Sequence, residues 1–272
     1  MASQSFVVRD LLGVLNEIAA FSLAESWDNV GLLAGDPAAP VRGILVALDP
    51  TEAVVDEALG AGCNVVVTHH PVIFHPLKAV CTDTPVGRLL AKALSAGVAL
   101  VACHTNLDLV GGGVNDVLAE RLGLVETRPL ADTPGEEFGF GRIGRLAEPL
   151  PGREMLARVA RTLGVEAVAF AGPVPETVRS MAVCGGSGSE LAETAHRLGA
   201  QMYVTAEVKH ATARWAEAAG LCVVDGGHFA TENVVVPEFV RLLRHAMERG
   251  GHELPIRAAA AQRSPFFYCI VS

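Results

Sequence analysis

Val65-Val66-Val67-Thr68-His69-His70-Pro71 is the most informative segment of the sequence, because an apolar, β-branched run ends abruptly in two adjacent histidines. The run predicts a buried strand whose end delivers two imidazoles into a loop, where open α/β sheets usually carry their functional residues. Adjacent strand residues point to opposite faces, but Pro71 turns the chain just beyond them, so both rings are able to reach metal. The alternative is that one imidazole caps the strand and the other is solvated.

The segments around this strand alternate between short apolar runs and amphipathic stretches of about a dozen residues, the pattern of βαβ units with a parallel sheet. The predicted helices cover residues 7–21, 51–62, 84–97 and 113–123, with Thr51 and Thr84 as N-caps. Strands are predicted at 44–48 and 98–103, and an ordered loop at 22–37. The first half is therefore predicted to be α/β.

The second half repeats the same rhythm after a change in composition. Residues 124–152 are rich in Pro, Gly and charge, with one strand-like run at 138–146, and predict a junction. Beyond it we predict helices at 153–163, 189–198, 207–218 and 233–248, and strands at 166–171, 178–184, 202–205, 221–225 and 266–271. The expectation is two α/β domains with mainly parallel or mixed sheets, over 1–126 and 127–272, the C-terminal part being free to pack back on the first.

Composition narrows the class of protein. Half of the 272 residues are hydrophobic, enough to bury a sizeable core. No apolar run approaches the roughly 20 residues that a membrane-spanning helix needs, and residues 1–10 lack a secretion signal, so we expect a cytoplasmic protein. A net charge of −9 argues against general binding of nucleic acid. The six cysteines form no Cys-x-x-Cys pair, and four lie beside or within apolar runs as predicted core thiols.

Ligand-type side chains collect at three predicted strand ends: His69 and His70, His104 and Asp108, and His228 and Glu232. The i, i+4 spacing of His228 and Glu232 puts both on one face of a predicted helix, whereas His104 and Asp108 are expected on a loop. Four imidazoles and two carboxylates suit Zn, Fe, Mn, Co or Ni, and two ions roughly 3.5–4 Å apart would use all six. The alternative is that these residues are strand caps, a helix start and an Asx turn.

Two further strand ends admit two interpretations each. The glycine-rich run 184–189 precedes a predicted helix, so its N–H groups either bind an anion or form only a tight turn. Glu207 and His210 either support a metal ligand, or Thr205 caps a helix and Lys209 is exposed, which is the simpler interpretation.

Six motifs follow one another along the chain: 27–32 (WDNVGL), 68–71 (THHP), 104–108 (HTNLD), 111–116 (GGGVND), 141–144 (GRIG) and 227–232 (GHFATE). Their order and spacing resemble the Nif-three-like dinuclear metal-centre proteins, often labelled GTP cyclohydrolase type 2 by homology. The resemblance covers nearly the whole chain. It implies a two-domain α/β fold in its compact form, without the domain that longer relatives insert, and a homohexameric ring with metal sites facing its interior.

The same resemblance implies two divalent metal ions per chain and a role for each candidate residue. The implied direct ligands are His69, His70, Asp108, His228 and Glu232, while His104 is a further ligand or a proton carrier. We expect a metal-dependent hydrolase using a metal-bridging hydroxide, of the GTP cyclohydrolase type by family label, with His104 transferring the proton. A nucleotide-like or phosphorylated ligand is expected if the 185–188 turn faces the site. The alternative is a non-catalytic metal-binding scaffold, storage or assembly protein.

Overall fold

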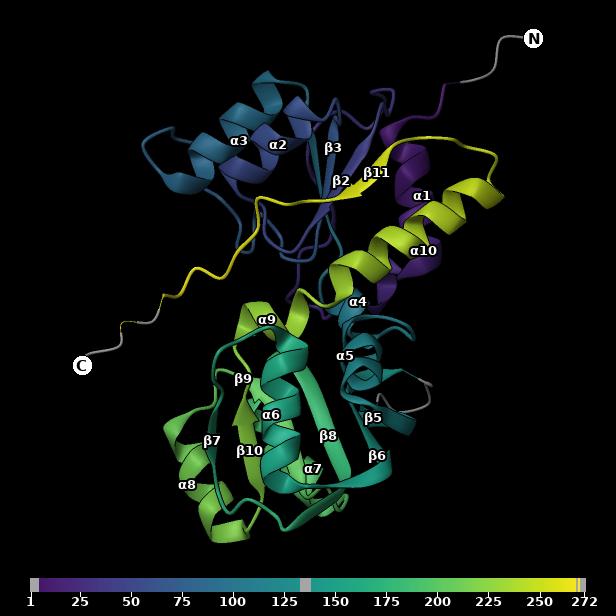
Figure 1. The fold of residues 1–272 in the computed structure, drawn as a ribbon. Helices are drawn as coiled ribbons and strands as arrows, with labels where there is room; N and C mark the ends of the chain where they lie inside the picture. The colour runs from purple at the N-terminus through teal and green to yellow at the C-terminus, as the bar shows by residue number, and fades with distance from the viewer. Residues whose placement is uncertain (1–4, 133–137, 268, 270–272) are drawn as a thin grey trace. The chain divides into compact units, whose positions relative to one another are not determined.

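Figure 1 shows the computed structural model, which describes residues 5–132, 138–267 and 269. By its contacts the chain divides into two compact units: residues 1–107 with 236–272 form unit 1, and residues 108–235 form unit 2. Each unit holds one sheet with both parallel and antiparallel strands, so the predicted α/β class with mixed sheets is confirmed. The units divide differently from the expected boundary at 126/127, which falls inside unit 2.

Unit 1 is a five-stranded sheet in the order β1-β4-β3-β2-β11, in which only β1 runs antiparallel to its neighbour. Its strands are β1 (Gly31–Ala34), β2 (Ile44–Ala47), β3 (Val65–Thr68), β4 (Ala99–Ala102) and β11 (Ile256–Ala258). Its helices are α1 (Val8–Ile18), η1 (Phe21–Leu23), α2 (Glu52–Gly60), α3 (Pro85–Ser95), α4 (Thr105–Leu109), which the unit boundary crosses, and α10 (Val235–Arg249). Helices α2 and α3 cover one face of the sheet, and α1 and α10 the other (Figure 1).

Local sequence explains why the helices of unit 1 begin where they do. The Thr51 and Thr84 hydroxyls accept hydrogen bonds from Val54 N (3.2 Å) and Gly87 N (3.1 Å), so both predicted N-caps are confirmed. All four residues of β3 are buried, as expected for a strand covered on both faces. Because β2, β3 and β4 are parallel, their carboxyl ends meet at one edge of the sheet.

Three segments of unit 1 differ from the predictions. The expected loop at 22–37 contains η1 and β1, and residues 104–108 are not a loop, because α4 begins at Thr105. The closing strand is β11, which pairs with β2, whereas Phe266 and Phe267 lie outside any strand and most of the rest of 266–271 lies outside the described residues. Strands of three or four residues are too short to show a clear alternating pattern.

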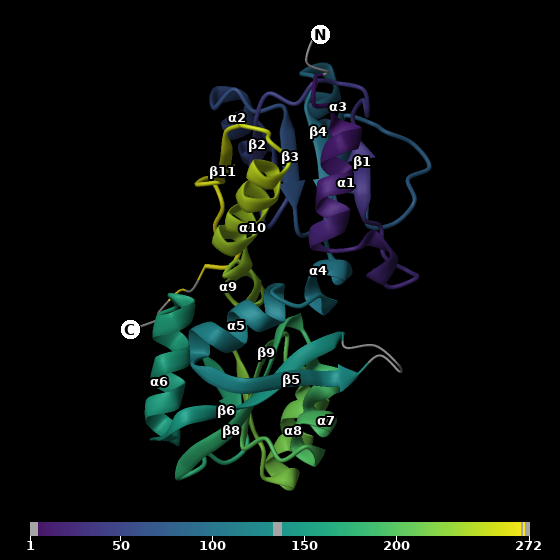
Figure 2. The same ribbon diagram turned by 90° about the vertical axis from the view of Figure 1, so that its right-hand side faces the viewer.

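Unit 2 is a six-stranded sheet in the order β5-β6-β8-β9-β10-β7. Its strands are β5 (Leu124–Asp132), β6 (Gly139–Pro151), β7 (Ala169–Ala171), β8 (Thr177–Ser187), β9 (Met202–Ala206) and β10 (Cys222–Asp225). Its helices are α5 (Val114–Leu122), α6 (Gly152–Leu163), η2 (Ser189–Leu191), α7 (Ala192–Arg197), α8 (His210–Ala219) and α9 (His228–Glu232). Strands β8, β9 and β10 are parallel, and β5, β6 and β7 run antiparallel to their neighbours. Figure 2 shows α6 and α7 on opposite faces of this sheet.

The predicted junction at 124–152 is wrong, because β5 and β6 pair along this segment and join the sheet of unit 2. Arg142 of β6 is buried and donates to Asp116 of α5 from Nε (2.5 Å) and Nη2 (2.9 Å). Its Nη1 donates to the carbonyl oxygens of Gly139 (2.7 Å) and Gly141 (2.8 Å). Arg142 therefore fastens the hairpin to the start of α5, which accounts for two of the six motifs.

The expected apolar thiols are confirmed, since Cys63, Cys103, Cys184 and Cys222 are buried and free. Burial raises the pKa of the Cys103 thiol to about 12, so it stays protonated beside His104. None of the helices in the described residues combines the length and the apolar character that are needed to span a bilayer.

Candidate metal centre

Unit 1 brings together three of the predicted histidines. His69 and His70 follow β3, and His104 follows β4, so parallel neighbouring strands deliver all three to one edge of the sheet. Their ring centroids are 5.0 Å (His69–His70), 5.1 Å (His69–His104) and 5.6 Å (His70–His104) apart. One ligand atom from each lies within 4.8 Å of the others, and the group is able to hold a metal ion.

Each of these imidazoles has its Nδ1 atom engaged by an oxygen. His69 Nδ1 lies 3.0 Å from the Cys103 carbonyl oxygen, which can only accept, so Nδ1 carries the proton. His70 Nδ1 lies 2.7 Å from a carboxylate oxygen of Asp49, and His104 Nδ1 lies 2.8 Å from one of Asp28. Protonated Nδ1 atoms leave the Nε2 lone pairs as the ligand atoms, the usual arrangement of histidines that bind metal.

Asp28 is the more elaborate of these two carboxylate partners. Its side chain is fully buried, and besides His104 it accepts from Thr105 N (3.0 Å) and Thr105 Oγ1 (2.5 Å). Burial alone would raise the pKa of Asp28, but the hydrogen bonds from His104 and Thr105 outweigh it and hold that pKa well below its usual range. Asp28 is therefore a fixed negative charge that orients His104.

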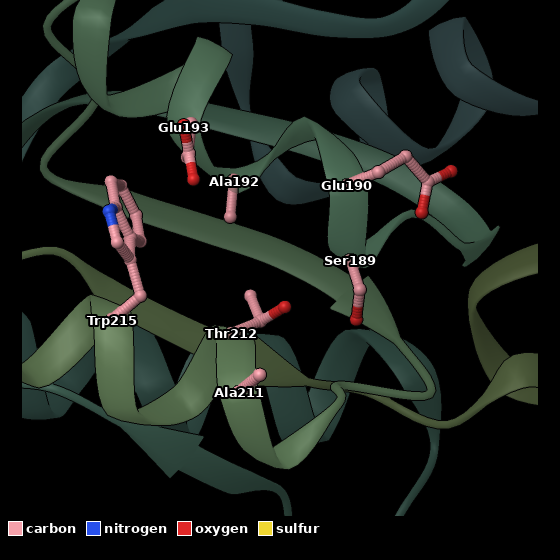
Figure 3. Close-up of a pocket in the computed structure, with 7 residues that line it drawn as sticks. All are labelled: Ser189, Glu190, Ala192, Glu193, Ala211, Thr212 and Trp215. Carbon is pink, nitrogen blue, oxygen red and sulfur yellow. The ribbon is translucent and has the colours of Figure 1, made fainter.

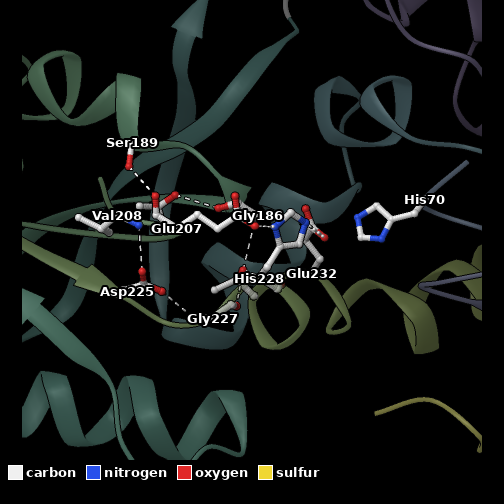
Figure 4. A network of polar contacts seen from close by, with 12 residues as sticks. His70, Gly186, Ser189, Glu207, Val208, Asp225, Gly227, His228 and Glu232 are labelled. Carbon is white, nitrogen blue, oxygen red and sulfur yellow. Dashed lines mark hydrogen bonds and ion pairs between the residues drawn. The ribbon is translucent and has the colours of Figure 1, made fainter. Parts of the chain in front are cut away.

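In unit 2, the predicted i, i+4 pair is confirmed, because His228 and Glu232 begin and end the single-turn helix α9. His228 Nε2 lies 3.0 Å from a carboxylate oxygen of Glu232, and its Nδ1 lies 2.8 Å from one of Glu207 (Figure 4). Glu232 is buried. Unit 2 thus repeats the arrangement of unit 1, with a carboxylate holding one side of an imidazole and the other side facing a second ligand-type group.

The remaining predicted ligand, Asp108, lies in α4 and is half-buried. Its backbone carbonyl oxygen accepts from Asn115 Nδ2 (3.0 Å), and Asn115 Oδ1 accepts from Gly185 N (2.9 Å). The amide of Asn115 therefore links the backbone of Asp108 to the end of β8, which gives the Asn of the 111–116 motif a positioning role.

The glycine-rich run 184–189 supports the ligand pair of α9. Gly185 N donates to Asn115, and Gly186 N donates to Thr231 Oγ1 (3.1 Å), so neither N–H group is available to an anion. Gly186 has φ +63°, and a Cβ atom there would lie 2.0 Å from a carboxylate oxygen of Glu232. The absence of a side chain at Gly186 thus makes room for the Glu232 carboxylate.

The segment after β9 agrees with one part of each interpretation of residues 205–210, since Glu207 supports a candidate ligand and Lys209 is exposed. Glu207 contacts His228, as expected for a residue that supports a ligand, and it does so from a left-handed backbone conformation with φ +53°. His210 and Lys209 are exposed. Thr205 is not a helix cap, because its buried hydroxyl donates to the Gly186 carbonyl oxygen (3.1 Å).

Asp49 was not among the predicted site residues, and no contact with a histidine was predicted for Asp28. Asp49 follows β2 just as His70 follows β3, so its place after a predicted strand was an available signal. Asp28 lies in a quoted motif, but its contact with His104 joins residues 76 apart in the chain and no local pattern reports it.

Unit 2 also has a surface pocket of about 320 Å³, between η2, α7 and α8 (Figure 3). Its lining residues are Ser189, Glu190, Ala192, Glu193, Ala211, Thr212 and Trp215. No candidate ligand is among them, but Ser189 Oγ donates to the backbone carbonyl oxygen of Glu207 (3.0 Å).

Comparisons with known proteins identify the family of the chain. The profile of the Duf34/NIF3 (NGG1p interacting factor 3) family matches residues 6–265. The chain belongs to the Duf34/NIF3 family. This membership confirms the resemblance drawn from the motifs.

Relatives of the chain within the Duf34/NIF3 family match it over nearly their full length. A Clostridium acetobutylicum protein named GTP cyclohydrolase 1 type 2 homolog is 32% identical over 264 residues, 96% of this chain and 98% of that protein. A Streptomyces coelicolor protein of the same name is 34% identical, over 94% of this chain and 92% of that protein. The crystal structure of a Bacillus cereus protein related to NIF3 superposes with a TM-score of 0.92 at 27% identity, over 98% of this chain and 100% of that one.

Proposed function

We propose that this Duf34/NIF3 chain is a metal-dependent hydrolase that binds two divalent metal ions through His69, His70, Asp108, His228 and Glu232, with His104 as a further ligand or as a proton carrier. The observation that carries the proposal is shared by both units. Four imidazoles have Nδ1 engaged by an oxygen atom: His69, His70, His104 and His228. Structural histidines have no need for such uniform orientation, whereas metal ligands do, because the second nitrogen must present its lone pair.

The donor set fits a divalent ion of the Zn, Fe, Mn, Co or Ni type. Imidazole nitrogens and carboxylate oxygens suit these metals, and no thiolate takes part, since the pKa of the adjacent Cys103 thiol is raised. Divalent ions in such sites lower the pKa of water and polarise a carbonyl or phosphoryl oxygen, which is the chemistry of metal-dependent hydrolysis.

The residues around the ligands would position and move protons. In its role as proton carrier, His104 would take or give the proton at Nε2, because its Nδ1 is held by Asp28. The Asp28 carboxylate would stabilise the imidazolium form that arises when His104 accepts a proton. Asp49 and Glu207 would do the same work of orientation for His70 and His228.

The names of the relatives agree with hydrolysis of a small molecule, since those of Clostridium acetobutylicum and Streptomyces coelicolor are called GTP cyclohydrolase 1 type 2 homologs. These names are the reason to propose a nucleotide-like or phosphorylated ligand. The 185–188 turn does not support that ligand, because its first two N–H groups already donate to Asn115 and Thr231. The homohexameric ring and the cytoplasmic location expected from the sequence stay predictions.

Metal analysis of the purified full chain, combined with a panel of nucleotides, phosphoesters and cyclic amides, tests this proposal. We expect two ions per wild-type chain, turnover of at least one substrate class, and loss of both metal and turnover in His70→Ala. His75→Ala is the matched control for metal content, because His75 is an exposed histidine five residues further on. Glu232→Gln, measured in parallel, tells whether the ligands of unit 2 bind their metal independently.

Each negative outcome rejects a different part of the proposal. Fewer than one ion in metal-replete wild-type protein would reject the dinuclear centre. Two ions without turnover across the whole panel would reject the hydrolase and support the non-catalytic scaffold. Equal metal contents in His70→Ala and His75→Ala would remove His70 from the ligand set.

A further inference from the structure

Two exposed aromatic side chains of unit 1 lie beside the histidine group. Trp27 is 57% exposed and Phe74 is 43% exposed, although aromatic side chains of this size usually contribute buried area. Their ring centroids are 5.8 Å apart, and the His104 ring lies 6.3 Å from Trp27 and 6.1 Å from Phe74. The three rings thus form a triangle with nearly equal sides, two of its corners open to solvent and the third a candidate metal-site residue.

Polar contacts of the neighbouring residues hold this aromatic pair in place. Asp28, next to Trp27, is bonded to His104 and Thr105. Asn29 Nδ2 donates to the carbonyl oxygen of Ile73, the residue before Phe74, at 2.6 Å. Both aromatic residues therefore flank segments that the structure fixes, and their exposure is a feature of an ordered surface.

From this arrangement we propose that Trp27 and Phe74 form a stacking surface for a planar heteroaromatic ring of the substrate, which makes them specificity-determining residues. This inference rests on the proposed function. The aromatic ring of the hydrolase substrate would stack on Trp27 and Phe74, and its reacting group would lie beside His104 and the metal ligands. The substrate class it names is a nucleobase-like heterocycle carrying a carbonyl or phosphoryl group.

The three rings pack on one another in tilted and edge-to-face arrangements, which are preferred aromatic geometries, and this packing holds the exposed pair in a fixed orientation. The indole and phenyl planes meet at 50°, and the imidazole stands nearly perpendicular to both, at 78° and 75°. A ligand ring stacked on the indole face would meet Phe74 at a tilt, which is among the preferred aromatic geometries. Because every base has a π-face, such a surface selects for aromaticity and leaves the choice of base to other contacts.

The proposal predicts a penalty that depends on the aromatic part of the ligand. The probes are guanosine 5′-monophosphate and ribose 5-phosphate, which share a phosphorylated sugar and differ in the base. Isothermal titration of the metal-loaded full chain should show about 5- to 150-fold weaker binding of the nucleotide to Trp27→Ala, the range for loss of one stacked base. Ribose 5-phosphate should bind the two proteins equally, and Trp27→Phe should recover most of the loss.

The chain offers two matched controls. Phe170 is 48% exposed, on β7 of unit 2, so Phe170→Ala removes an equally exposed aromatic ring without touching the histidine group and should leave both affinities unchanged. The chain has two tryptophans, so Trp215→Phe leaves Trp27 as the single indole reporter. Its fluorescence should be quenched by the nucleotide and should not respond to ribose 5-phosphate.

Three results would overturn the stacking surface. They are an unchanged nucleotide affinity in both Trp27→Ala and Phe74→Ala, an equal loss for ribose 5-phosphate, and a smaller assembly of these variants in sedimentation velocity with unaltered nucleotide binding. The last result would assign the pair to a contact between copies of the chain. Metal content and turnover are measured on the same samples, so a failure of the hydrolase proposal would be seen in wild type, separately from the effect of Trp27.

Discussion

The two units fix the orientation of their histidine rings with different secondary structure. In unit 1, the carboxyl ends of parallel strands deliver His69, His70 and His104, and a backbone carbonyl and two carboxylates fix the rings. In unit 2, the single-turn helix α9 presents His228 and Glu232, and a glycine of β8 leaves the space that the carboxylate occupies.

Both units therefore fix the orientation of an imidazole ring, although the secondary structure that supports the ring differs. A sheet edge is rigid because several strands are bonded side by side, whereas a one-turn helix depends on the elements packed against it. Unit 2 should therefore be the more sensitive of the two to substitutions outside the ligands themselves.

The largest expected effect follows from Arg142, the buried arginine of β6. Arg142→Met removes the charged partner of Asp116, which keeps its hydrogen bond from Gly112 N, and frees the carbonyl oxygens of Gly139 and Gly141. We therefore expect a loss of about 3–5 kcal/mol in the free energy of unfolding. Arg145 of the same strand pairs with Glu126 at the exposed surface, where solvent screens the charges, and Arg145→Met should change the stability little. Urea unfolding measures both.

Hydrogen exchange on Arg142→Met tests whether the two units are stabilised separately. We expect faster exchange in β5, β6 and α5, with β2, β3 and β4 protected as in wild type. Equal loosening of both sheets would show that the units are not separately stabilised, and equal effects of Arg142→Met and Arg145→Met would show that burial of the ion pair is unimportant.

Gly186 gives an intermediate effect that separates stability from metal binding. Gly186 (φ +63°) and Gly164 (φ +66°) share a left-handed conformation, but only at Gly186 would a Cβ atom meet the Glu232 carboxylate, at 2.0 Å. Each alanine variant should lose about 1–2 kcal/mol of stability from the backbone alone. Because the carboxylate is the end of a flexible side chain, it can move aside, and only Gly186→Ala should lose metal affinity, by tenfold or more.

Thermal unfolding and metal titration of these two variants give the answer. A metal affinity of Gly186→Ala equal to that of Gly164→Ala would show that the position of the Glu232 carboxylate is not critical, and would weaken its assignment as a ligand. A stability loss in Gly186→Ala far beyond that of Gly164→Ala would mean that the surrounding backbone, and not the side chain, absorbs the clash.

The sequence predicted the elements whose pattern is local. The β-branched run before His69 and the i, i+4 spacing of His228 and Glu232 can be read within a few residues, and both were placed correctly. The strand-like run predicted at 138–146 is confirmed as part of β6. Strand β11 was missed because it has three residues, and β5 was missed because half-exposed segments rich in Pro, Gly and charge resemble a linker.

The partners of the imidazoles were harder to predict than the imidazoles. Asp28 and Asp49 lie 76 and 21 residues from the histidines they contact, and only pairing of strands and docking of a loop bring them close. Glu207 was considered, but its contact depends on a left-handed backbone conformation that sequence does not reveal.

The smallest expected effect concerns the carboxylates behind the ligands, one from each unit. Asp49→Asn and Glu207→Gln keep the size of the side chain and remove the charge that orients His70 and His228. Loss of such a partner typically weakens metal binding 10- to 100-fold, with a smaller change in stability because the Asp49 side chain is 39% exposed and that of Glu207 is 59% exposed. Competition titration with a chelating dye measures the affinity of each ion. Asp36→Asn is the control, because Asp36 is an exposed aspartate whose side chain accepts from the Ala38 N–H in a turn, and it should bind metal as wild type does. If the strand ends of unit 1 are the more rigid scaffold, the loss of metal affinity should be about tenfold for Asp49→Asn and about 100-fold for Glu207→Gln. The reverse order would contradict this difference between the units. It would show that the histidines at the strand ends depend more on their carboxylate partners than His228 does.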